Sequence, residues 1–250
     1  MESVKNFKTF ISESVLFEGR YNTIVNDIVS DVMDLIKKTN TGEKKYNGIK
    51  ISYSKSDDVP SFFELIEKGK FLKVGEYRSE KSDVDVTVNL LLIRDEVPVY
   101  PGDFIVTGDA DDQAATIYVE ISLDPASEPN CYSDIVPDLK DVVRHEIEHL
   151  TQRGWNEKSG KYMRSNQGAR NRIFLNPDLR YKYYKLKDEV DANLQGLYTK
   201  AKTLKRPFKD VVMDFLDRQT KMGIIPEERK FEIYNLWRRR AKTIGGLPLL

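Results

Sequence analysis

The chain has 250 residues, and its 40 lysine and arginine residues balance 40 aspartate and glutamate residues, so the formal net charge is zero. A balanced chain has no overall field that would attract nucleic acid or an anionic membrane, and we expect neither as a partner. The single cysteine, Cys131, excludes an internal disulfide, and no apolar run approaches the roughly 20 residues that a membrane-spanning helix needs. The chain therefore suits a reducing compartment.

Residues 1–20 are expected to form a short leader or tail ahead of a single domain over residues 21–250. Charged residues interrupt each apolar stretch in the first twenty positions, so we predict no secretory signal peptide and no export by that route. An amphipathic tail that packs on the domain is the alternative to a leader.

The first half of the domain is predicted to hold one helix and a small sheet. Apolar residues recur at intervals of three and four between residues 24 and 36, which indicates an amphipathic helix. Residues 49–53 are typical of a short strand, and apolar residues stand at every second position from Val84 to Leu92, which predicts a half-buried strand. Residues 98–113 predict a loop or a broken strand, and residues 115–123 predict a further strand.

The second half changes from a period of two to a period of about 3.6 residues. Helices are predicted at roughly 137–152, 179–204, 207–220 and 227–242. An N-terminal helix and a small mixed sheet, followed by a helical C-terminal half, make the expected fold α+β.

The predicted helix 137–152 contains the pattern HExxH, as His145, Glu146 and His149. Four residues turn an α-helix by about 400°, so both imidazoles fall on one face and can bind one Zn²⁺. A glutamate next to the first histidine can reach a water on that ion, so Glu146 is the candidate general base. An ordinary surface helix with two solvated histidines is the alternative interpretation.

A helical wheel supports the metal interpretation. Both histidines lie beside an apolar arc, Glu146 falls on its edge, and Arg144 and Glu148 are expected to point to solvent. An ionisable side chain at the edge of an apolar arc is costly unless a partner compensates it, which suits a base in a cleft. The arc is formed by Leu139, Val142, Val143, Ile147 and Leu150.

A catalytic zinc site needs a third protein ligand and keeps a fourth position open. The chain has only two histidines, so the third ligand is a carboxylate or Cys131, which is expected in a loop before the helix. Glu189 is the best carboxylate, because it borders the apolar stripe of its predicted helix next to small residues. Asp188 and Asp191 project further from that side and are expected to be solvated or to support the ligands. A charge at the shoulder of a core stripe is the alternative for Glu189.

These residues resemble the gluzincin branch of zinc peptidases. The resemblance implies a zincin-like fold, a peptide or protein substrate, and hydrolysis by a metal-activated water. It also implies that residues 115–123 form the edge strand that aligns the substrate. Gluzincins often carry a histidine or tyrosine that stabilises the oxyanion, and no third histidine exists here. The tyrosines that could replace it are Tyr162, Tyr181, Tyr183, Tyr184 and Tyr198.

A second resemblance concerns the N-terminus. Residues Asn6–Glu13 are similar to the capsid-targeting leader on internal proteins of large contractile-tailed bacteriophages, and residues 138–152 resemble uncharacterised virion-associated proteins of such phages. This resemblance implies a location in a virion or in the host cytoplasm, with the capsid or the prohead protease as partner. A non-catalytic virion structural or interaction protein, with zinc that only stabilises its fold, is the alternative to a peptidase.

The leader resemblance predicts where the chain is cut. The prohead-protease pattern of an aliphatic residue, any residue and glutamate ends at Glu13 and again at Glu18. Protein isolated from mature particles is therefore expected to begin at Ser14 or Gly19, which N-terminal sequencing would detect. An intact Met1 on virion-derived protein would contradict the leader.

Overall fold

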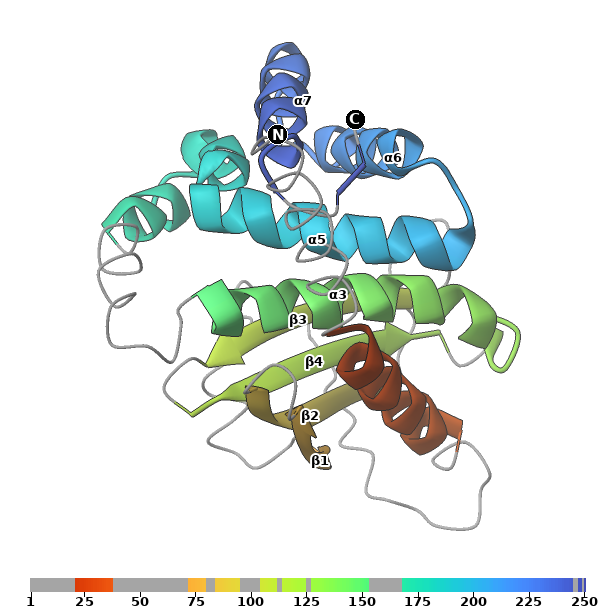
Figure 1. Cartoon of the computed structure of the whole chain (residues 1–250). Helices are drawn as coiled ribbons and strands as arrows, with labels where there is room; N and C mark the ends of the chain where they lie inside the picture. The colour runs from red at the N-terminus through yellow and green to blue at the C-terminus, as the bar shows by residue number, and fades with distance from the viewer. Residues whose placement is uncertain are drawn as a thin grey trace, which may run out of the picture. The chain divides into compact units, whose positions relative to one another are not determined.

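The computed structural model describes residues 21–37, 72–79, 84–94, 104–111, 114–124, 127–152, 168–244, 247, 248 and 250 (Figure 1). The predicted leader, the predicted strand at 49–53 and Tyr162 lie outside these residues. Contacts within the chain define two compact units, one covering Ile24–Val143 and the other including Arg144–Leu250. Among the described helices, none is long and apolar enough to cross a membrane.

The first unit contains a mixed four-stranded sheet with the order β1-β2-β4-β3. Strand β1 pairs antiparallel with β2, β2 pairs parallel with β4, and β3 pairs antiparallel with β4. The four strands are β1 (Leu72–Ser79), β2 (Val84–Arg94), β3 (Phe104–Asp111) and β4 (Thr116–Leu123). The α+β class and the mixed sheet are therefore confirmed.

The position of β4 corrects the expectation of an edge strand at residues 115–123. Strand β4 lies inside the sheet, and β1 and β3 are the edges of its described part. The stretch predicted as a loop or broken strand contains β3, whose threonine, glycine and aspartates hide it from an apolar alternation. Polar and charged residues are common on edge strands because they discourage pairing with another chain. Strand β4 also starts one residue late, because Ala115 has a positive φ of 49° in the preceding turn.

The core of the first unit follows the alternation of β2 and β4. Val86, Val88 and Leu90 on β2 are buried, as are Ile117 and Ile121 on β4. The predicted amphipathic helix is confirmed at residues 21–37, and it is tied to β1 by the Tyr77 hydroxyl, which donates to Asp31 Oδ2 at 2.7 Å.

The helices of the second half largely match the expected bounds. They are α3 (Tyr132–Gln152), a further helix at 168–174, the 3₁₀ helix η2 (Pro177–Lys185), α5 (Lys187–Leu204), α6 (Phe208–Lys221) and α7 (Glu227–Ala241). Buried apolar residues of α5, α6 and α7 form one core, with Leu194, Leu216 and Trp237 at its centre.

The single helix expected at 179–204 is wrong, because the chain breaks at Leu186. Leu186 has extended dihedrals (φ −66°, ψ 133°), so η2 ends there and α5 begins at Lys187. A 3₁₀ helix has three residues per turn, so side chains at i and i+3 share a face. Tyr181 and Tyr184 accordingly both pack against the helical core.

Trp237→Ala is expected to destabilise the protein by about 3–5 kcal/mol, because it opens a large cavity in a closed core. Trp237 is fully buried, stacks on Phe215 with ring centroids 5.8 Å apart, and donates from Nε1 to the Tyr184 carbonyl at 2.8 Å. The urea midpoint measures the loss. Phe231→Ala on the same helix is the control, since Phe231 is 60% exposed and its loss should change stability by less than about 0.5 kcal/mol. Equal shifts for both variants would contradict the assigned core.

Candidate metal centre

Helix α3 brings the two histidines together near its C-terminal end. The Nε2 atoms of His145 and His149 are 3.0 Å apart, and the rings meet edge to face with centroids 4.7 Å apart. Two bare imidazole lone pairs at this distance repel, so they must share either a proton or a cation. The expected common face of the two histidines is confirmed, and both present the same nitrogen to one point.

Glu189 completes the group from the first turn of α5. Its Oε2 lies 3.6 Å from Nε2 of His145 and 3.4 Å from Nε2 of His149. The side chain of Glu189 has no exposed surface, and that of His149 is only 6% exposed. Burial alone would raise the pKa of Glu189, but the two imidazoles outweigh burial and lower that pKa from its usual value. The structure therefore brings together the three residues that the sequence nominated as ligands.

The spacing of the three atoms fits a small tetrahedral cation. Ligand atoms about 2.0–2.1 Å from a tetrahedral zinc ion lie about 3.3 Å from one another. The three observed separations are 3.0, 3.4 and 3.6 Å. The circle through the three atoms has a radius of about 1.9 Å, so one ion just outside their plane could contact all three. Both Glu189 oxygens are buried and lack a hydrogen bond of good geometry within the described residues, which leaves Oε2 available to a cation.

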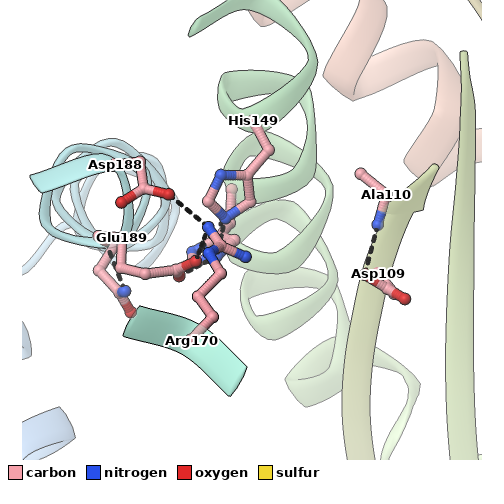
Figure 2. Close-up of polar contacts among 8 residues, drawn as sticks. Asp109, Ala110, His149, Arg170, Asp188 and Glu189 are labelled. Atoms are coloured by element: carbon pink, nitrogen blue, oxygen red, sulfur yellow. Dashed lines mark hydrogen bonds and ion pairs between the residues drawn. The ribbon is translucent and has the colours of Figure 1, made fainter. Parts of the chain in front are cut away.

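Arg170 is the site residue that sequence reasoning missed. It lies on helix 168–174, and its Nη2 approaches both Asp188 Oδ2, at 2.5 Å, and Glu189 Oε1. Figure 2 shows Arg170, Asp188, Glu189 and His149 pointing toward one another from three separate helices. Burial would lower the pKa of Arg170, but the Glu189 carboxylate and the bond to Asp188 raise it. No motif or periodicity marks this arginine, because helix 168–174 is short and mostly exposed.

The other candidate ligands have different partners. Asp188 is 3% exposed and accepts a hydrogen bond from Arg170. Of its two expected roles, a solvated carboxylate or a support for the ligands, only the second fits this burial. Asp191 accepts two hydrogen bonds from Arg240 of α7, at 2.5 and 2.6 Å. Cys131 directly precedes α3, whose rise places it about 20 Å along the helix axis from His145. Cys131 is therefore not a ligand.

Tyr183 is the candidate tyrosine that reaches the site. Burial and the nearby Glu189 carboxylate raise the pKa of Tyr183 well above its usual value, and Glu146 adds to this effect. Tyr184 instead donates to Gln219 Oε1 at 2.8 Å, and Tyr198 packs on Phe208 with ring centroids 5.4 Å apart. Of the candidates on described residues, Tyr183 is therefore the one beside Glu189.

Glu146 is buried, at 6% exposure, on the helix that carries both histidines. Its effect on the pKa of Tyr183 places its charge within electrostatic reach of the site. The neighbouring expectation that Arg144 points to solvent is wrong. Its side chain is 7% exposed, pairs with Glu148 at 2.8 Å and lies over the ring of Tyr21, 4.9 Å from its centroid. Glu148 is also largely covered, at 18% exposure.

The fold and the site define an α+β protein with a candidate metal centre of two histidines and one glutamate. Comparisons with known protein families, with curated proteins and with solved structures give no match for this chain.

Glu189→Ala is expected to weaken zinc binding by a large factor, because it removes one of three ligand atoms and leaves two histidines. His145→Ala and His149→Ala should abolish binding for the same reason. Asp191→Ala is the matched control: it removes a carboxylate two residues further along α5 that is held by Arg240, and it should leave zinc affinity near wild type. Asp188→Ala should have a smaller effect than Glu189→Ala. Isothermal titration calorimetry with zinc measures all five variants, and equal losses for Glu189→Ala and Asp191→Ala would overturn the choice of ligand.

Proposed function

We propose that this chain is a zinc-dependent peptidase in which His145, His149 and Glu189 hold the metal and Glu146 is the general base. The observation that carries the proposal is the triangle of Nε2, Nε2 and Oε2 atoms, with sides of 3.0, 3.4 and 3.6 Å. These sides are close to the separation of about 3.3 Å between ligand atoms around a tetrahedral zinc ion, which supports the proposal.

The composition of the group supports zinc in a catalytic rather than a structural role. Two imidazoles and one carboxylate are a ligand set of catalytic zinc sites, whereas structural sites are closed by four protein ligands, usually with cysteine. Within the described part of the chain, the group contains three members and no cysteine. A fourth position for water is therefore consistent with the site.

The chemistry follows from the residues around the metal. Zinc, when bound, lowers the pKa of a coordinated water and polarises a carbonyl oxygen. Glu146 is one residue from His145 and buried, so its carboxylate can accept a proton in the site and return it to a leaving amine. A tyrosine hydroxyl is protonated at neutral pH, and burial and the Glu189 carboxylate raise the pKa of Tyr183 further, so its hydroxyl could donate to a developing oxyanion.

The substrate class comes from the resemblance to gluzincins, which share HExxH and a later glutamate. Peptide hydrolysis is part of the proposal on that ground. The virion setting rests on residues 1–20 and on the sequence around the motif, and it would make the capsid the place where the enzyme is carried. The competing function is a virion structural protein in which zinc only stabilises the fold.

Glu146→Gln separates these functions, because glutamine keeps the shape of the side chain but cannot accept a proton. Zinc content should stay near one ion per chain, and kcat on a cleavable peptide should fall by about 10² to 10⁴ with a smaller change in KM. A peptide-library digest of the wild type would supply the substrate, and metal analysis of both proteins would supply the zinc content.

Glu148→Gln is the matched control, since it makes the same change two residues along the helix at a side chain that pairs with Arg144. It should retain both zinc and activity. Equal turnover by Glu146→Gln and wild type, with both carrying zinc, would exclude Glu146 as the base. Zinc-loaded wild type that cleaves nothing in the library would favour the structural function.

A further inference from the structure

The two oxygens of the Glu189 carboxylate have different surroundings. Oε2 faces the two histidine nitrogens, at 3.4 and 3.6 Å. Oε1 faces Nη2 of Arg170, which lies within ion-pair distance. One carboxylate is thus shared between a candidate metal position and a guanidinium, with a separate oxygen for each.

Arg170 is itself held in place on its other side. Its Nη2 also donates to Asp188 Oδ2, at 2.5 Å, and the Asp188 side chain is 2% exposed. The ring of Tyr183 lies 5.9 Å from Arg170 Cζ. A partly buried guanidinium needs compensation for its lost hydration, and here the Asp188 and Glu189 carboxylates supply it. Arg170 therefore has little freedom to leave Oε1.

This arrangement limits how Glu189 can bind a metal. A carboxylate can ligate a cation through one oxygen or through both. A guanidinium at Oε1 competes directly with the second mode, because a cation moving toward Oε1 would meet a fixed positive charge. Only Oε2 is then free to ligate.

We propose that Arg170, supported by Asp188, is a positioning residue that restricts Glu189 to one-oxygen ligation and so keeps the coordination number at that of three protein ligands and one water. The inference rests on the proposed metal site at His145, His149 and Glu189. It adds Arg170 as the residue that limits how many atoms bind the metal. Arg170 acts through Glu189 and does not itself contact the metal.

The test uses the full-length protein loaded with Co²⁺ in place of Zn²⁺, because the visible absorption of Co²⁺ weakens as its coordination number rises. Arg170→Gln frees Oε1, so its Co²⁺ bands should be less intense than those of wild type. Zn²⁺ affinity, measured by competition with a chelator, should also fall about 10- to 100-fold, as for other groups that orient a ligand. Arg170→Lys keeps the charge but loses the planar guanidinium, and it should recover only part of both signals.

Arg172→Gln is the matched control. Arg172 lies on the same short helix, is exposed, and its Nε donates to the Gly168 carbonyl at 3.2 Å. Its Co²⁺ spectrum and Zn²⁺ affinity should equal those of wild type. Asp188→Asn leaves Arg170 and Glu189 unchanged but weakens the bond between Asp188 and Arg170. It should shift the Co²⁺ spectrum in the same direction as Arg170→Gln, by a smaller amount.

The outcomes separate this inference from the metal site. If wild type binds Co²⁺ and Zn²⁺ while Arg170→Gln matches it in both readouts, the positioning role is wrong and the metal site stands. If wild type binds neither ion, both are wrong. Should circular dichroism show that Arg170→Gln is unfolded, Arg170→Lys and Asp188→Asn decide: altered Co²⁺ bands support the role, and wild-type bands in both overturn it.

Discussion

Burial of the Glu189 carboxylate is the constraint on which the candidate site depends. A carboxylate without exposed surface has lost its hydration, and it stays charged only where other groups replace the water. Glu189 has three such replacements. The N-terminus of α5 favours negative charge in its first turn, Arg170 approaches Oε1, and His145 and His149 face Oε2. The last of these requires a proton or a cation shared among the three atoms.

The break at Leu186 follows from the same constraint. If η2 and α5 were one continuous helix, the backbone N–H groups of residues 187–189 would be bonded within it, and no helix N-terminus would exist at Glu189. The extended Leu186 starts a new helix there, so Asp188 and Glu189 both lie in a first turn. The break also leaves Tyr183 on a 3₁₀ helix, where the period of three separates it from Tyr181 and Tyr184. One break in the backbone thus orients a candidate ligand and a neighbouring hydroxyl.

Patterns with a fixed period could be predicted from the sequence, and contacts between distant segments could not. HExxH specifies a shared face because the α-helix has a known pitch, and Glu189 could be chosen because it borders a stripe with Ala192, which is fully buried. Arg170 had no such marker, since its role depends on where helix 168–174 meets α5. Strand β3 could not be predicted, because the polar and charged residues of this edge strand break the apolar alternation. Arg144 was expected at the surface because a wheel treats a helix as packed on one side, whereas Tyr21 covers its other side.

The C-terminal helices hold the segment that carries Glu189 and Tyr183 in place. Arg240 of α7 binds Asp191 through two hydrogen bonds, two residues after Glu189. Trp237 of the same helix donates to the Tyr184 carbonyl, next to Tyr183, and the Tyr184 hydroxyl donates to Gln219 of α6. A site is held to within about 0.5 Å only when its supports are themselves locked by packing and hydrogen bonds.

These ties flank the η2–α5 junction on both sides, so the orientation of Glu189 is a property of the helical unit. A cation that binds only the folded arrangement stabilises that arrangement in proportion to its affinity and concentration. Thermodynamic linkage runs both ways. For any cation that binds there, formation of the junction raises its affinity by the same free energy by which the bound cation stabilises the junction.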